Sequence, residues 1–335
     1  MTNRILYNIK RCIQLACLPL KMGKYLKHGV YKYNTSVTIL YPVKNLRHKN
    51  PQVFGAIEEN GNIFRKLFSK LYCYINCFSK SEFKGDYMVV TSSEREFKFF
   101  NHQENLLLTN YSSLEKLEFV YQQRTYWAEW FPTVSCTKDT REKTILEPLV
   151  NTKPFQSDCA FRQLLNDYAK YLKESSRGKA IEYYKPNYSY LNKFCALWGD
   201  TSFRTNLQQF LEDNPVPLFR THGDLWKSNM LFDGEKFYYI DFEQTGERPF
   251  FYDIFMYFVS DAFVLHDRYL LNKFISGEFD VLIRQISESL NYKFDNTKRR
   301  LYLSLFVFEL FCNRWIGTKD ENMVTAVYDL ITTNE

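Results

Sequence analysis

The eight cysteines of this 335-residue sequence include no Cys-x-x-Cys pair. A chain of this length does not need a disulfide framework to hold a core together. We therefore expect the cysteines to be reduced thiols and the protein to be cytoplasmic.

The sequence also has no long apolar run and no dense block of one charge. No stretch approaches the roughly 18 apolar residues that a membrane-spanning helix needs. Lys and Arg number 44 against 38 Asp and Glu, a formal net charge of +6, and they are spread along the chain. This pattern does not predict a nucleic-acid partner, although it leaves a modest preference for anionic partners. The hydrophobic fraction of 45% is ample for a buried core.

The first 34 residues form a basic amphipathic segment. Its pattern predicts an amphipathic helix, for which two alternatives stay open. The helix either lies peripherally on an anionic membrane surface or packs on its own domain. The apolar positions that recur at helical spacing are Ile5, Leu6, Ile9, Cys12, Ile13, Ala16, Cys17 and Leu20, and the basic residues around them are Arg4, Lys10, Arg11, Lys21, Lys24 and Lys27.

Residues 35–132 are rich in strand signals. Between these strands, the stretch 92–107 predicts a helix, with Ser92 or Ser93 as its N-terminal cap. The predicted strands cover residues 36–41, 52–57, 63–68, 117–122 and 125–130.

Residues 133–335 are dominated by helix patterns, interrupted by a two-strand unit at 217–243. The order of elements predicts an α+β fold in three parts: the segment 1–34, a strand-rich part 35–132 and a mainly helical part 133–335. The predicted helices cover residues 161–173, 206–212, 251–264, 274–290 and 300–315.

Polar side chains gather in the stretch THGDLWKSNMLFDGEKFYYIDFEQ, residues 221–244. A strand is expected to end near Thr221, so that Asp224 lies in a loop with Asn229 five residues on. A second strand then ends at Asp241. Two carboxylates and an amide oxygen can hold Mg²⁺ when phosphate oxygens and water complete its coordination. Phosphoryl transfer needs one further carboxylate to accept or orient the attacking hydroxyl.

The order His222-x-Asp224-x₄-Asn229, followed by Ile240-Asp241, resembles the catalytic and metal-binding segments of the aminoglycoside phosphotransferase and choline kinase superfamily. The resemblance implies a two-lobed protein-kinase-like fold, with the active site in the cleft between a strand-rich and a helical lobe. It also implies ATP and Mg²⁺ as cofactors.

The resemblance assigns a role to each residue of the motif. Asp224 is the implied catalytic residue, and Asn229 and Asp241 are the implied metal ligands. His222 is assigned to structural support. Asp253 resembles the aspartate that binds N–H groups of the catalytic loop, although it could equally cap a helix.

In the N-terminal lobe the resemblance implies a phosphate-binding cation on a strand and a glutamate on a helix. Lys66 or Arg65 on the strand 63–68 supplies the cation, and Glu96 or Glu94 its partner. The stretch 126–132 resembles the hinge that reads the adenine edge. Its implied contacts are Glu129, Trp130 and Phe131. Residues 42–52 contain no glycine, so the glycine-rich phosphate loop of such kinases is missing there.

The acceptor stays open between several hydroxyl compounds. The basic N-terminal segment and the net charge favour a sugar of a lipopolysaccharide core or another surface glycan, whereas choline, ethanolamine and aminoglycosides are alternatives. A choline site requires an aromatic cage with a carboxylate. Trp226, Trp315, Tyr257 and Glu309 are candidates for it. A binding module with the kinase fold but without turnover is the alternative of another class.

Overall fold

The computed structural model describes residues 22–34, 39–42, 72–75, 81–91, 96–198, 202–318, 321 and 323–332. The chain divides into two compact units. Unit 1 contains residues 1–122 and 134–150, and unit 2 contains residues 123–133 and 151–335. The predicted N-terminal helix, the strands 52–57 and 63–68, and the residues Arg65, Lys66 and Glu94 lie outside the described residues.

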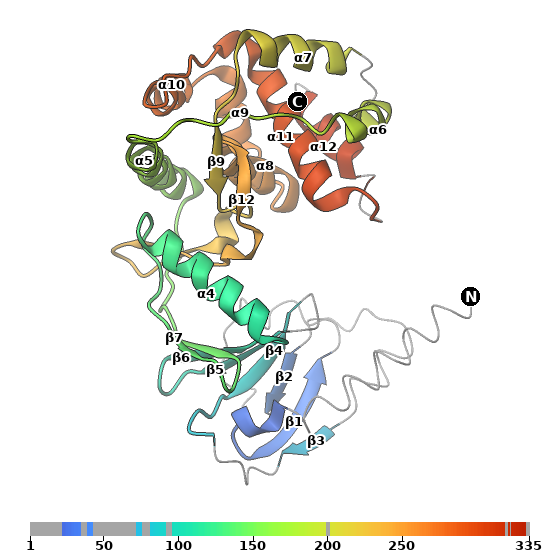
Figure 1. Cartoon of the computed structure of the whole chain (residues 1–335). Coiled ribbons are helices and arrows are strands. Elements are labelled where there is room, and N and C mark those ends of the chain that lie inside the picture. Colours follow the sequence, from blue (N-terminus) through green and yellow to red (C-terminus); the bar gives the residue numbers. More distant parts are fainter. Residues whose placement is uncertain are drawn as a thin grey trace, which may run out of the picture. The chain divides into compact units, whose positions relative to one another are not determined.

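Unit 1 is built on an antiparallel sheet (Figure 1). Its described strands follow the order β3-β1-β2-β4-β5-β6-β8-β7. One hydrophobic cluster of the unit includes Leu40, Met88, Phe99 and Leu108 from four of these strands. The strands are β1 (Gly29–Asn34), β2 (Ile39–Pro42), β3 (Tyr72–Ile75), β4 (Tyr87–Val90), β5 (Phe97–Asn101), β6 (Leu106–Asn110), β7 (Thr137–Asp139) and β8 (Thr144–Pro148).

The predicted helix 92–107 was wrong. The chain forms β5 and β6 there, paired from Phe97 opposite Asn110 to Asn101 opposite Leu106. Burial alternates along β5, with Phe97, Phe99 and Asn101 buried, which is the period of two that a strand imposes. Asn105 adopts φ 54° just before β6 begins and thereby helps the chain to reverse.

The two strands predicted at 117–122 and 125–130 were also wrong, because one helix, α4 (Leu114–Ala128), occupies residues 117–122 and 125–128 and a turn follows it. The Ser113 hydroxyl accepts the Lys116 N–H at 3.1 Å and so caps the first turn. Leu117, Val120 and Trp127 are buried at helical spacing. The aromatic and β-branched residues that suggested strands are accommodated because this face packs on a core, and packing overrides intrinsic propensity.

Unit 2 is mainly helical, and Figure 1 shows its helices gathered around the short pair of strands β9 (Leu218–Thr221) and β12 (Gly246–Pro249). A second antiparallel pair joins β10 (Met230–Phe232) to β11 (Phe237–Tyr239). The helices are α5 (Ser157–Ser175), α6 (Tyr188–Trp198), α7 (Phe203–Asp213), α8 (Tyr252–Val264), α9 (Tyr269–Ser276), α10 (Asp280–Glu288), α11 (Arg299–Leu310) and α12 (Met323–Thr332).

The helix expected over residues 274–290 is two helices, because Gly277 takes φ +89° and ends α9. A π-helical turn, Phe311–Trp315, continues α11. The expected α+β class, with a strand-rich N-terminal part and a mainly helical C-terminal part, is confirmed. Of the helices in the described residues, none has the length and apolar character needed to span a bilayer.

Candidate active site

The loop that carries Asp224 begins with a turn at Gly223. Gly223 has φ +82°, a conformation that glycine adopts without a Cβ penalty. A Cβ at this position would lie 2.1 Å from the Gln244 carbonyl oxygen and 2.6 Å from Arg248 Nη1. The close approach of these segments follows from the β9–β12 pairing, in which Thr221 lies opposite Gly246. The turn therefore requires glycine.

Asp253 at the start of α8 fixes the backbone of this turn. Its Oδ2 accepts the His222 N–H at 2.6 Å, and its Oδ1 accepts the Gly223 N–H at 2.8 Å. Tyr168 of α5 donates its hydroxyl to Oδ2 at 3.3 Å. Burial raises the pKa of the Asp253 carboxyl. Asp253 therefore holds the turn at Gly223 rather than capping α8.

His222 and Ile240 connect the loop to the segment that carries Asp241. The Asp224 N–H donates to His222 Nδ1 at 3.4 Å, so Nε2 carries the proton and donates to the Ile240 carbonyl at 2.9 Å. The Ile240 N–H donates to the Asn229 carbonyl at 3.1 Å. Both backbone groups of Ile240 are thus bound to the loop, one through His222 and one through Asn229. Asp241, the next residue in the chain, therefore follows a residue that is fixed to both.

Asn229 is oriented by Asp224. Its Nδ2 donates to the Asp224 carbonyl at 2.7 Å and to Asp224 Oδ2 at 3.2 Å. Because both partners are acceptors, the amide oxygen Oδ1 points away from them and is available to a cation. Asn229 itself is buried.

Asp241 adopts the left-handed conformation, φ 66° and ψ 61°, two residues beyond the end of β11 at Tyr239. A non-glycine residue in this region stores strain of about 1 kcal/mol or more, and such strain is concentrated at functional sites. The carboxylate is exposed. Among the described residues no group of three or more His, Cys, Asp and Glu side chains could hold a metal by itself. The amide of Asn229 and the carboxylate of Asp241 fit Mg²⁺ only if phosphate oxygens and water complete the coordination of the ion.

Arg314 was not among the site residues expected from the sequence. It lies on the π-helical turn, and its Nη2 donates to the Gly223 carbonyl at 2.6 Å and to Asp224 Oδ1 at 2.8 Å. Ninety residues separate Arg314 from Asp224. No local motif could have indicated the contact.

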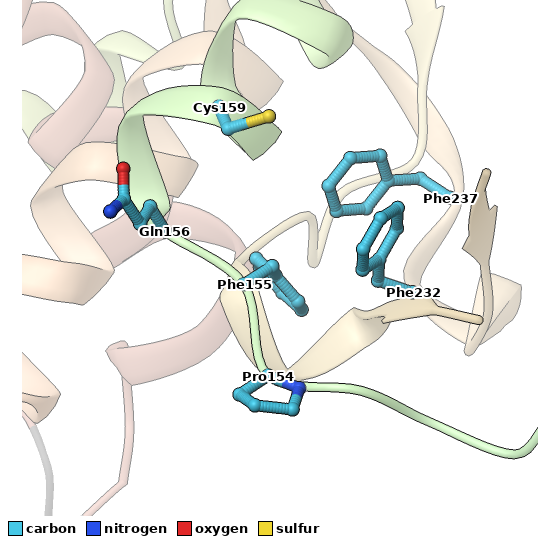
Figure 2. A pocket seen from close by; sticks show the side chains of 6 residues that line it. All are labelled: Pro154, Phe155, Gln156, Cys159, Phe232 and Phe237. Atoms are coloured by element: carbon cyan, nitrogen blue, oxygen red, sulfur yellow. The ribbon is translucent and has the colours of Figure 1, made fainter. Parts of the chain in front are cut away.

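A pocket of about 430 Å³ lies near the catalytic loop within unit 2 (Figure 2). The Phe155 and Phe237 ring centroids are 5.1 Å apart, and those of Phe232 and Phe237 are 4.7 Å apart. Lys227, three residues after Asp224, places its Nζ over the Phe155 ring, 5.6 Å from the ring centroid. The pocket is lined by Pro154, Phe155, Gln156, Cys159, Phe232 and Phe237.

The predicted hinge has a different structure from the one expected. Glu129, Trp130 and Phe131 follow the end of α4, where their N–H groups donate to the carbonyls of Tyr126 and Trp127. These N–H groups are consequently bound within the chain itself. Contact of Glu129, Trp130 and Phe131 with an adenine stays a prediction.

Trp127 has a structural function in unit 2. Its Nε1 donates to Thr245 Oγ1 at 3.0 Å, and its ring stacks on Phe242 with centroids 6.3 Å apart. Trp127 is fully buried. It therefore supports the segment that follows Asp241.

Glu96 was expected on a helix, but it directly precedes β5. It is buried, and Lys116 of α4 lies 3.8 Å from its carboxylate. The expected partners Lys66 and Arg65 fall outside the described residues. The pairing of Glu96 with either of them stays a prediction.

Comparison with known proteins points to one family. Residues 160–279 match the model of the phosphotransferase enzyme family. A LicA homolog of Metamycoplasma hominis is 23% identical over 168 residues, which cover 50% of this chain and 63% of that protein, less than two thirds of its length.

Two solved structures are similar at low identity. The choline kinase LicA from Streptococcus pneumoniae is 12% identical with a TM-score of 0.44, over 72% of this chain and 90% of that chain. An aminoglycoside phosphotransferase from Streptomyces rimosus is 12% identical with a TM-score of 0.39, over 65% of this chain and 90% of that chain.

The matched segment contains Asp224, Asn229, Asp241 and Asp253. Asn229 binds Asp224, Asp253 binds the N–H groups of the turn at Gly223, and Asp241 has a left-handed backbone. Residues 160–279, which carry these side chains, thus match the phosphotransferase enzyme family.

Proposed function

We propose that the protein transfers the γ-phosphoryl group of ATP to a hydroxyl of a small molecule or glycan, with Mg²⁺ as cofactor. The observation that carries the proposal is the connection of Asp224, Asn229 and Asp241 through Ile240, whose N–H and C=O both bind the catalytic loop. A kinase of this type needs a hydroxyl-directed carboxylate and metal ligands in one fixed arrangement.

Asp224 is proposed to accept or orient the proton of the acceptor hydroxyl. Oδ1 already accepts from Arg314 and Oδ2 from Asn229, yet each carboxylate oxygen has a second lone pair for the substrate. These two contacts fix the rotamer of the carboxylate, so little ordering is needed when the hydroxyl arrives.

Asn229 Oδ1 and the Asp241 carboxylate are proposed to hold Mg²⁺. When bound, the ion neutralises charge on the phosphate oxygens. His222 and Asp253 are proposed to keep the loop in position, through Ile240 and through the N–H groups of the turn. Lys66 or Arg65 is proposed to contact the phosphates.

The acceptor is proposed to be a sugar hydroxyl of lipopolysaccharide or another surface polysaccharide. The net charge of +6 and the basic residues among positions 1–34 support an anionic acceptor or surface. A choline or aminoglycoside acceptor is the second candidate, since the similar structures include a choline kinase and an aminoglycoside phosphotransferase.

The test is a screen with labelled ATP and Mg²⁺ against lipopolysaccharide-core sugars, choline, ethanolamine and aminoglycosides. Asp224→Ala should lower turnover by roughly 10² or more while binding of Mg²⁺·ATP survives, because the carboxylate acts on the hydroxyl and not on the nucleotide. If the wild type binds Mg²⁺·ATP but phosphorylates no acceptor, the protein is a binding module. Normal turnover of the variant would remove Asp224 from the mechanism.

A further inference from the structure

Arg314 touches the carboxylate that acts on the acceptor. Its Nη2 lies 2.8 Å from Asp224 Oδ1 and 2.6 Å from the Gly223 carbonyl oxygen. A hydroxyl that donates to the same Oδ1 at about 2.7 Å would lie within about 5.5 Å of Nη2, because the two contacts share that oxygen. The substituents beside the reacting hydroxyl therefore meet a guanidinium group.

The turn that carries Arg314 is held in place by hydrogen bonds to Glu309. Asn313 Nδ2 donates to the Glu309 carbonyl at 2.7 Å and to Glu309 Oε2 at 3.2 Å. Tyr184 donates its hydroxyl to Glu309 Oε1. Burial raises the pKa of Glu309. These contacts fix the π-helical turn and hence the direction of the Arg314 side chain.

The same contacts weaken the case for a cationic acceptor. Glu309 was a candidate for the carboxylate of a choline cage, but both of its oxygens accept hydrogen bonds from the chain. Tyr257, a candidate for the cage wall, is fully buried in the core of unit 2. Neither side chain is presented to a ligand.

The guanidinium of Arg314 has donor capacity left. Among the described residues its hydrogen bonds run through Nη2 alone, and about a quarter of the side chain (27%) is exposed. Nη1 and Nε can therefore donate to a ligand. A carboxylate or phosphate oxygen forms charge-assisted hydrogen bonds with such N–H groups, and the charge of the guanidinium adds to the attraction.

We infer that Arg314 determines specificity: it selects acceptors that carry an oxyanion, a carboxylate or a phosphate, close to the hydroxyl that is phosphorylated. This inference rests on the proposed phosphotransferase function. The cation attracts such a group and repels an ammonium group at the same place. Arg314 is thereby more than a brace for Asp224, since a brace would act equally on every acceptor.

The test compares matched acceptors that differ in one charged group: glucose with glucuronate, glucose with glucose 1-phosphate, and choline as the cationic case. The wild type should show kcat/KM at least about 10-fold higher for the anionic member of each pair. Arg314→Gln should bring this ratio close to one, and Arg314→Lys should give an intermediate ratio because it keeps the charge but loses the Nε and Nη1 donors. Arg204→Gln, at an exposed arginine that donates to Asn192, is the matched control.

An unchanged ratio in Arg314→Gln, with kcat lowered equally for neutral and anionic acceptors, would overturn the inference and leave Arg314 as a positioning residue. Thermal unfolding establishes that each variant is folded. If the wild type phosphorylates neither these compounds nor any acceptor of the screen described above, the proposed function fails, and calorimetric binding of the same compounds decides the inference separately. Binding of the anionic members that Arg314→Gln weakens supports it, and absence of such binding contradicts it.

Discussion

The carboxylate of Asp253 accepts the backbone N–H of His222 at 2.6 Å, and that of Gly223 at 2.8 Å. Two adjacent N–H groups are thus bound by one fully buried side chain from a different element. The direction in which the chain leaves β9, and so the position of Asp224, depends on this contact.

Asp253→Asn should destabilise the protein and lower activity. An amide offers one acceptor where the turn presents two N–H donors, so a buried donor is left without a partner at a cost of about 2 kcal/mol. Urea unfolding should report this loss, and kcat should fall by more than KM changes. Unaltered stability would show that the two N–H groups have another partner in solution.

Gly223→Ala should be strongly destabilising, by about 3 kcal/mol or more, because the new Cβ meets a backbone oxygen as well as an unfavourable φ. Gly178→Ala is the control. Gly178 has φ +72° with no atom within 4 Å of the added Cβ, so only the conformational cost of about 1 kcal/mol applies. Equal losses in the two variants would remove the steric argument.

Asp241→Gly and Asp241→Ala should separate strain from function. Both should weaken Mg²⁺-dependent binding of ATP by about 10-fold or more, since each removes the carboxylate. Glycine, however, adopts φ 66° freely and should leave the free energy of unfolding equal to that of the wild type or higher by up to about 1 kcal/mol. Calorimetry and urea unfolding measure the two effects. A wild-type affinity in both variants would exclude Asp241 as a metal ligand.

Asp261 in α8 should make stability depend on pH. Burial raises the pKa of this carboxyl from 3.8 to about 6. The folded state therefore binds the proton more tightly than the unfolded state, so its contribution is complete below about pH 4 and is lost as the pH rises through about 6. Asp261→Asn should be more stable than the wild type by about 3 kcal/mol at pH 7.5, with the difference vanishing near pH 4. A pH-independent difference would contradict this assignment.

Secondary structure was predicted well where a local sequence pattern indicated it, and poorly where tertiary packing selected between helix and strand. The helix over residues 161–173 lies within α5, whereas α4 was read as two strands. The strand-favouring residues of α4 gather at Phe119–Tyr121 and Thr125–Trp127, and the burial of Leu117, Val120 and Trp127 along one face supports the helix instead.

The sequence by itself determined which chemistry is proposed for the loop, because His222, Asp224 and Asn229 lie within eight positions in the order of a local motif. It also indicated Asp241 and Asp253, from the strand and the helix that follow. Only the tertiary structure decided that Arg314 contacts Asp224. That contact joins residues 90 positions apart, and its existence depends on how α11 and its π-helical turn pack against the loop rather than on any periodic pattern.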